Sequence, residues 1–282
     1  MVAGSRWDRR RGSGSLGRRK DRTPPMLGTQ FTTGSPSWID LGSPDTEAAA
    51  AFYGAVLGWE FRSAGPDAGD YGFFQQDGRT VAALGPLTEK GASSAWTVYF
   101  RTPDADATQK AAEAAGGTVR VPAFDVMDAG RMAALTDPGG AQFAVWQPGS
   151  TQGLERTSSV NTLVWAELHV ADPESVLAFY RTLFGWRWAE MEAPGMTYRV
   201  ISTAEGDQED ASFGGVAELQ GKTPHWIPYF AVDDADAMAR TAQGNGGSVL
   251  MPAADIPDVG RIAWLADPFG APFAVLKPAP MG

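Results

Sequence analysis

Two carboxylates occupy matching places in the chain, each two residues beyond a tryptophan. Asp40 follows Trp38, and Glu167 follows Trp165. Residues i and i+2 of a strand lie on the same face, so each carboxylate is expected to share a surface with its tryptophan. A carboxylate on such a surface can accept a proton or orient a ligand hydroxyl. Asp40 and Glu167 are therefore the candidate catalytic residues.

A structural role competes with this interpretation. A carboxylate inside a cleft is costly unless it is paired or hydrated. Arg131 and Arg261 recur at matching places in the two halves of the chain and are candidate salt-bridge partners for Asp40 and Glu167. Both interpretations stay open at the level of sequence.

Both histidines of the chain, His169 and His225, lie in its second half. His169 shares the strand face of Glu167, and His225 lies just before a later strand-like run. Together with Glu167 they would form a two-histidine, one-carboxylate site for a divalent metal if the strand ends converge. Gly42 and Ala95 stand at the matching places of the first half. This alternative metal site is therefore confined to the second half.

These residues belong to an internal duplication. The repeated unit is longer than about 100 residues, which is too long for a solenoid repeat. It therefore predicts two tandem domains of one fold. The matching segments are 38–59 and 165–186, 116–122 and 246–252, 125–131 and 255–261, and 137–145 and 267–275.

Each copy predicts two βαβββ modules in succession. Asp45 precedes a run with helical spacing that stops at Gly58, and in the second copy Asp172 and Gly185 mark the corresponding ends. Short runs separated by Gly, Asp and Pro indicate strands. The expected strands include 37–42, 59–62, 71–75, 80–84 and 95–101 in the first copy and 187–190, 197–202 and 213–219 in the second, with a further helix at 105–115.

The predicted fold class is α+β, with two tandem domains that each form a curled sheet around a cleft. Side chains of one strand parity would line that cleft, and concave sites of this kind bind small ligands. The expected organisation is a disordered basic leader at 1–35, a first domain at 36–148, a polar linker at 149–160 and a second domain at 161–282.

Composition excludes several classes of function. The chain has no Cys, so disulfides, thiolate metal sites and cysteine nucleophiles are absent. Its net charge is −10 although the leader is basic, and an acidic body repels nucleic acid. No apolar run approaches the roughly 20 residues that cross a bilayer. We therefore expect a cytoplasmic protein with no nucleic-acid or membrane partner.

Two motifs occur in both copies. One is Asp-x6-Phe-Tyr-x3-Leu/Phe-Gly-Trp, and the other is Gly-Arg-x3-Leu-x-Asp-Pro-x-Gly-x2-Phe. With these motifs the chain resembles, over residues 36–280, the vicinal oxygen chelate superfamily of glyoxalases, bleomycin-resistance proteins and extradiol dioxygenases. It looks most like the tandem glyoxalase-like proteins of actinobacteria. The resemblance implies two tandem vicinal-oxygen-chelate domains.

The same resemblance implies where a metal would be held. Metal-using members carry His, His and Glu on the first, fifth and eighth strands of the domain. In this chain the first-strand position falls on Trp38 and Trp165, the fifth near Thr97 and Ile227, and the eighth on Ala144 and Ala274. None of these side chains ligates a metal. We therefore expect no metal cofactor, with one divalent metal in the second domain as the alternative.

Aromatic side chains replace the ligands. They are large and flat, with a polar edge that suits stacking against a planar ligand, but the alternative is that they fill the cleft as a core. A buried phenol also needs a hydrogen-bond partner, which a ligand would supply. The candidate ligand-binding residues are Trp38, Tyr99, Trp146, Trp165 and Tyr229.

The leading hypothesis is metal-independent binding of a flat, largely apolar natural product, with a role in antibiotic resistance, sequestration or secondary metabolism. The expected partner is a small molecule, and whether the chain forms a homodimer stays open. The competing hypothesis is an enzyme. It would be a glyoxalase-like lyase or oxygenase using the second-domain metal site, or a metal-free catalyst on a polyketide with Asp40 or Glu167 as its base.

Overall fold

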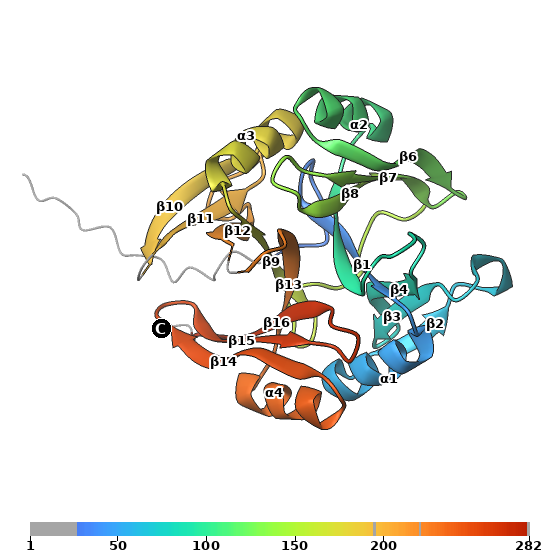
Figure 1. The fold of residues 1–282 in the computed structure, drawn as a ribbon, viewed down its shortest axis with the longest axis vertical. Helices are drawn as coiled ribbons and strands as arrows, with labels where there is room; N and C mark the ends of the chain where they lie inside the picture. The colour runs from blue at the N-terminus through green and yellow to red at the C-terminus, as the bar shows by residue number, and fades with distance from the viewer. Residues whose placement is uncertain (1–26, 194–195, 220, 281–282) are drawn as a thin grey trace, which may run out of the picture.

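A computed structural model describes residues 27–193, 196–219 and 221–280. It contains two eight-stranded sheets, ordered β2-β3-β4-β1-β5-β8-β7-β6 and β10-β11-β12-β9-β13-β16-β15-β14 (Figure 1). Neither sheet is closed, and each is built from two βαβββ modules. The predicted α+β fold with two tandem domains is therefore confirmed.

The elements of the two domains follow the same order. The first domain comprises β1 (Pro36–Ser43), α1 (Thr46–Leu57), β2 (Glu60–Ser63), the short 3-10 helix η1 (Pro66–Ala68), β3 (Gly72–Gln76), β4 (Arg79–Pro86), β5 (Ala95–Arg101), α2 (Ala105–Ala114), β6 (Thr118–Val126), β7 (Gly130–Thr136) and β8 (Gln142–Pro148). The second comprises β9 (Leu163–Val170), α3 (Pro173–Phe184), β10 (Arg187–Ala193), β11 (Met196–Ser202), β12 (Ser212–Glu218), β13 (His225–Ala231), α4 (Ala235–Gly244), β14 (Ser248–Ile256), β15 (Gly260–Ala266) and β16 (Pro272–Pro278).

The first helix of each domain begins and ends where the sequence predicts. The Asp45 side chain accepts a hydrogen bond from the backbone N–H of Ala48, and that of Asp172 accepts one from Ser175. Gly58 and Gly185 end these helices in the left-handed conformation, with φ of 69° and 70°. These caps fix how each helix follows the central strand that carries a candidate carboxylate.

The two domains pack against each other through the sheet faces opposite the clefts. Phe100 of β5 contacts Trp226 of β13 with ring centroids 5.0 Å apart, and Trp59 contacts Phe230 at 5.1 Å. In Figure 1, α1 lies beside α4 and α2 lies beside α3. The interface is thus an aromatic core, and the sheet faces that carry Asp40 and Glu167, called the cleft faces below, point away from it by strand alternation.

The Asp-Pro turns that recur in both copies form hydrogen bonds between the two domains. The Tyr180 hydroxyl donates to Asp137 of the other domain at 3.0 Å, and Tyr53 donates to Asp267 at 3.5 Å. Each phenol in turn accepts from an indole N–H of its neighbouring strand, at 3.0–3.1 Å. The turns therefore join the domains.

The predicted leader and linker are also more ordered than expected. Residues 27–35 cannot belong to a disordered leader, since Leu27 is buried and the Gly34 carbonyl accepts a hydrogen bond from Trp186 at 2.9 Å. The rest of the leader, 1–26, lies outside the described residues. In the linker, Leu154 is buried and Glu155 accepts from the backbone N–H of Thr80. The segment 149–160 is thus packed against the first domain.

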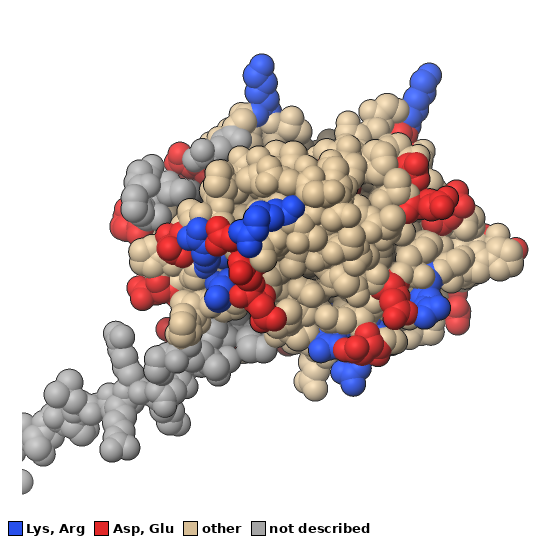
Figure 2. All heavy atoms as spheres, turned by 90° about the horizontal axis from the view of Figure 1, so that it is seen from below, with Lys and Arg blue, Asp and Glu red and all other residues tan. Residues whose placement is uncertain are grey.

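Charged side chains leave one broad surface uncharged. On the face shown in Figure 2, acidic and basic residues lie around the edge of an area without Lys, Arg, Asp or Glu. In the described part of the chain, no helix is long and apolar enough to span a membrane.

Candidate functional site

The carboxylate of Glu167 is the centre of a closed hydrogen-bond network on the cleft face of β9. Its Oε1 accepts from Tyr229 at 2.8 Å and bonds His169 Nε2 at 2.8 Å, and its Oε2 accepts from Tyr198 at 2.6 Å. Two indoles extend the network, because Trp165 donates to Tyr198 and Trp264 donates to Tyr229, each at 3.0 Å. Glu167 is 6% exposed.

A glycine leaves the space that Tyr198 needs to join this network. Gly215 on β12 pairs with Glu167 across the parallel ladder. A Cβ at this position would lie 1.9 Å from the Tyr198 hydroxyl oxygen. The missing side chain therefore lets Tyr198 cross over β12 to reach Glu167. In the first domain Gly85 of β4, which pairs with Gly42, makes room for the Tyr71 ring, since a Cβ there would lie 2.7 Å from it.

Asp40 is in a looser version of the same arrangement. Tyr99 donates to its Oδ2 at 2.7 Å, and the Thr97 hydroxyl also bonds it. Trp38 donates to Tyr71 at 3.4 Å, a longer contact than its counterpart in the second domain. Asp40 is partly exposed. The predicted pair of a tryptophan and a carboxylate on one strand face is thus present in both clefts.

The two carboxylates differ in acidity. Burial raises the pKa of Asp40, and the hydrogen bonds from Tyr99 and Thr97 lower it. Burial is the larger effect, so the pKa of Asp40 is about 6. Burial also raises the pKa of Glu167, but His169 and the two phenols outweigh it and hold that pKa below its ordinary value. The phenol of Tyr99 has its pKa raised by burial and by the charge of Asp40. Near neutral pH both carboxyls are ionised, and Asp40 is the one poised to exchange a proton.

The expected metal-ligand positions on the first and eighth strands lie in one row across each sheet, together with a tyrosine of the fifth strand. Across the sheet, Tyr99 is the register partner of both Trp38 and Ala144, and the second domain repeats this row with Trp165, Tyr229 and Ala274. Indole and methyl groups are not metal ligands, and both phenols are held by carboxylates. The row thus offers no chelating set.

The alternative metal set is brought together, but as a hydrogen bond and a stack. His169 bonds Glu167, and its ring lies parallel to His225 with centroids 5.1 Å apart. His225 Nδ1 is 2.9 Å from the Thr223 carbonyl, to which it donates. Burial lowers the pKa of His225 and favours its neutral form. Among the described residues, no group of three or more His, Asp or Glu is arranged to hold a metal ion.

The remaining candidates have structural partners. Trp146 is buried and donates to the Thr151 carbonyl at 3.0 Å, which ties it to the segment after the first domain. The expected alternative of a salt bridge from Arg131 or Arg261 to the cleft carboxylates is wrong. Arg131 pairs with Asp106 and Asp125, and Arg261 pairs with Asp236 and Asp255.

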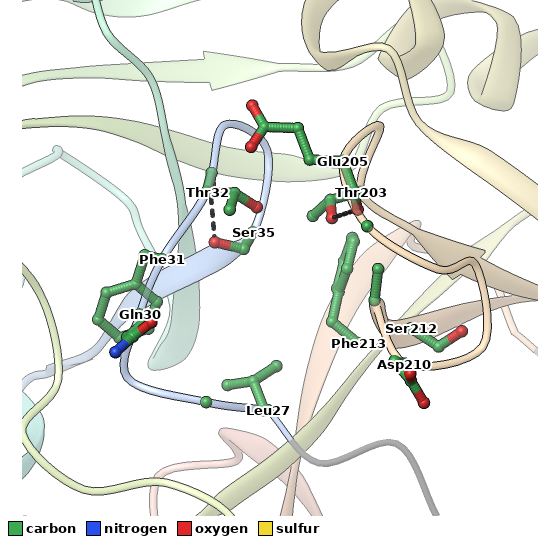
Figure 3. Close-up of a pocket in the computed structure, with 13 residues that line it drawn as sticks. Leu27, Gln30, Phe31, Thr32, Ser35, Thr203, Glu205, Asp210, Ser212 and Phe213 are labelled. Carbon is green, nitrogen blue, oxygen red and sulfur yellow. Dashed lines mark hydrogen bonds between the residues drawn. The ribbon is translucent and has the colours of Figure 1, made fainter.

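Two surface hollows lie away from these clefts. One, of about 350 Å³, separates residues 27–35 from the loop that joins β11 to β12, and Figure 3 shows Phe31, Phe213, Glu205 and Asp210 around it. The other, of about 400 Å³, adjoins it beside Arg101. Neither is lined by a residue that the sequence analysis singled out.

Sequence reasoning missed the phenols of the third strands and one indole. Tyr71, just before β3, and Tyr198, on β11, occupy matching places in the two copies. Tyr198 donates to Glu167, whereas Tyr71 accepts from Trp38. Alignment of the two copies would have paired them. Trp264 has no aromatic counterpart, because Ala134 occupies its place in the first domain, and no repeat signal marks it.

Comparison with known proteins agrees with this architecture. The sequence profile of the Glyoxalase/Bleomycin resistance protein/Dioxygenase superfamily matches residues 35–145 and 162–275. A Mycobacterium bovis protein named "Putative glyoxylase CFP32" is 41% identical over 89% of this chain and 98% of its own. The "Anthracycline biosynthesis protein DnrV" of Streptomyces peucetius is 40% identical over 88% of this chain and 95% of its own.

Solved structures share the fold at low sequence identity. The 2,3-dioxygenase LapB from Pseudomonas sp. KL28 superposes with a TM-score of 0.60 at 16% identity, over 89% of this chain and 94% of that one. The Mn(II)-bound glyoxalase from Novosphingobium aromaticivorans gives a TM-score of 0.60 at 17% identity, over 89% and 85%. By its duplicated motifs, its fold and its relatives, the chain belongs to the glyoxalase, bleomycin resistance protein and dioxygenase superfamily, also called the vicinal oxygen chelate superfamily.

Proposed function

We propose that the protein binds a flat, hydroxylated aromatic small molecule without a metal ion, as an accessory or sequestration protein for a natural product. The aromatic cleft of a domain is the site. Indole and phenol rings stack on the planar part of the ligand, and a cleft carboxylate orients its hydroxyl groups.

One observation carries this proposal. Across each sheet, one row of side chains is Trp38, Tyr99 and Ala144 in the first domain and Trp165, Tyr229 and Ala274 in the second. These rows include the expected metal-ligand positions of the first and eighth strands, and the expected fifth-strand positions lie near Thr97 and Ile227. Next to each row lies a carboxylate surrounded by hydroxyl donors. A site of this composition recognises aromatic surface and hydroxyl groups rather than an oxygen pair bound to a cation.

The relatives support the chemical class of the ligand. The Streptomyces proteins DauV and DnrV, each 40% identical, carry anthracycline biosynthesis in their names. Anthracyclines are planar, hydroxylated polyketides, which fit a cleft of indoles, phenols and a carboxylate. The glyoxylase name of the mycobacterial relative supports the competing function, a lyase.

Equilibrium dialysis against a panel of hydroxyanthraquinones and anthracyclines, with a chelator present, tests the proposal. We expect at least one compound to bind saturably in the presence of the chelator. Its affinity should not change when a divalent metal is added in place of the chelator. Binding or turnover that appears only after the metal is restored would favour the enzyme that uses Glu167, His169 and His225.

A further inference from the structure

The two clefts share a plan but differ at matched positions. Both contain a tryptophan, two tyrosines and a carboxylate. The first cleft is lined by smaller or more polar side chains at several places where the second carries bulk. Matched through the strand registers and the repeated segments, these pairs are Gly42 and His169, Ala95 and His225, Thr97 and Ile227, and Ala134 and Trp264.

In the second cleft, Glu167 and His169 are enclosed by neighbouring side chains, although Trp165 stays partly exposed. Glu167 receives three donors, and the indole of Trp264 packs edge-on against His169 with centroids 5.0 Å apart. Ile227, Tyr229 and Ala274 form a separate buried cluster with further apolar side chains around it. His169 is 2% exposed and Glu167 6%. A ligand hydroxyl would have to displace a phenol or the imidazole to reach this carboxylate.

The carboxylate of the first cleft is less enclosed and has fewer donors. Gly42 and Ala134 stand where the second cleft has an imidazole and an indole. Asp40 receives one phenol and the Thr97 hydroxyl where Glu167 receives two phenols and a histidine, and both Asp40 and Thr97 are partly exposed. A ligand hydroxyl can therefore add to Asp40 without breaking an existing bond.

The groups around Asp40 define the polarity of this cleft. Tyr71, which directly precedes β3, and Tyr99 of β5 lie near Asp40. Their phenols stay protonated, since burial and the charge of Asp40 raise the pKa of both. The charge of Arg120 on β6 lowers the pKa of Tyr99, although burial outweighs this effect. Arg120 also forms an ion pair with Glu89, in the loop between β4 and β5. Leu87 of the same loop approaches Gly42. This loop and β6 thus meet at the first cleft.

We infer that the first-domain cleft is the ligand site, with Asp40 accepting a hydrogen bond from a hydroxyl on the aromatic ring, and that the second cleft is a closed copy that stabilises its domain. This inference rests on the proposed function and adds the identity of the site. It assigns Asp40 to specificity, because an aromatic ring without a hydroxyl would displace water from this partly exposed carboxylate without supplying a donor in its place.

Isothermal titration of the full chain with alizarin and with daunorubicin, in a chelator, tests the inference. We expect one site per chain. Asp40→Asn should weaken binding roughly tenfold or more, the usual effect of losing a hydrogen bond to a charged group. The difference between wild type and Asp40→Asn should vanish at about pH 5, where Asp40 is protonated, since its pKa is about 6. Ala134→Trp, which places the second-domain indole in the first cleft, should abolish binding.

The outcomes separate the two proposals. Two sites per chain, or a loss of affinity confined to Glu167→Gln, would overturn the assignment to the first cleft while leaving the proposed function standing. No binding by the wild-type chain to either probe would overturn both. Thermal melts of each variant, followed by circular dichroism, show whether a loss of binding reflects the site or the fold, and Asp40→Asn tests the inference even if Ala134→Trp does not fold.

Discussion

Asp40 and Glu167 descend from one position of a duplicated domain, and their surroundings move their pKa values in opposite directions. Burial dominates at Asp40, whereas the hydrogen bonds from His169, Tyr198 and Tyr229 dominate at Glu167. An ionised carboxylate at this position therefore destabilises the fold at neutral pH in one domain and stabilises it in the other.

This difference gives opposite pH dependences for two isosteric variants. The raised pKa of Asp40 means that its contribution to stability is full below the ordinary value of 3.8 and is lost as the pH rises through about 6. Relative to wild type, Asp40→Asn should therefore gain about 1–3 kcal/mol in unfolding free energy as the pH rises across that window. The contribution of Glu167 is present above its ordinary pKa and is lost at lower pH, so Glu167→Gln should be most destabilising at neutral pH, by about 1–3 kcal/mol.

Urea unfolding of both variants and of the wild type, at about pH 4 and about pH 7, measures these differences. Equal pH profiles for the two variants would contradict the account of the carboxylates.

At this scale the sequence predicts the tryptophans and carboxylates of the clefts, because alternation along a strand places residues i and i+2 on one face. The sequence does not predict which side chains form hydrogen bonds with these residues. A ligand was expected to supply the hydrogen-bond partner of each buried phenol. Instead, Tyr99 donates to Asp40 and Tyr229 donates to Glu167. Tyr71 and Tyr198 reach the site from another strand, which depends on sheet order rather than on local pattern.

At the scale of elements, the turns after β7 and β15 connect the domains through helices α1 and α3. The Tyr180 hydroxyl accepts from Trp226 at 3.1 Å and donates to Asp137 at 3.0 Å, so the helix of one domain is joined to a turn of the other. The matching contact of Tyr53 with Asp267 is longer, at 3.5 Å. Helix caps were predictable from Asp and Gly, whereas these contacts were not, since they join residues of different domains.

Removing the hydroxyl of Tyr180 or of Tyr53 should show how much each contact between the domains contributes to stability. Tyr180→Phe leaves the Trp226 N–H and the Asp137 carboxylate without this partner inside a buried interface, at a cost of about 2–4 kcal/mol. Tyr53→Phe is the matched control and should cost less, because the bond to Asp267 is weaker. Chemical denaturation compares the two, and an equal or reversed order would show that the interface does not depend on the shorter bond.

For the whole molecule, a continuous buried cluster crosses from one domain to the other. It includes Tyr53, Trp96 and Phe100 of the first domain and Tyr180, Trp226 and Phe230 of the second. The repeat in the sequence predicts two domains but says nothing about this shared core, because apolar positions read the same whether they face a helix or a second domain.

The shared core predicts cooperative unfolding. Transitions followed by tryptophan fluorescence and by far-UV circular dichroism should coincide in urea, as expected when neither domain keeps its core alone. Two separate transitions would mean that each domain is stable without its partner.

A structure of the protein crystallised with alizarin in the presence of a chelator tests the central claim most directly. The account predicts the planar ligand against Trp38 with a hydroxyl at hydrogen-bond distance from Asp40. Ligand bound instead beside Glu167, or in the hollow between residues 27–35 and the β11–β12 loop, or only together with a metal held by Glu167, His169 and His225, would contradict it.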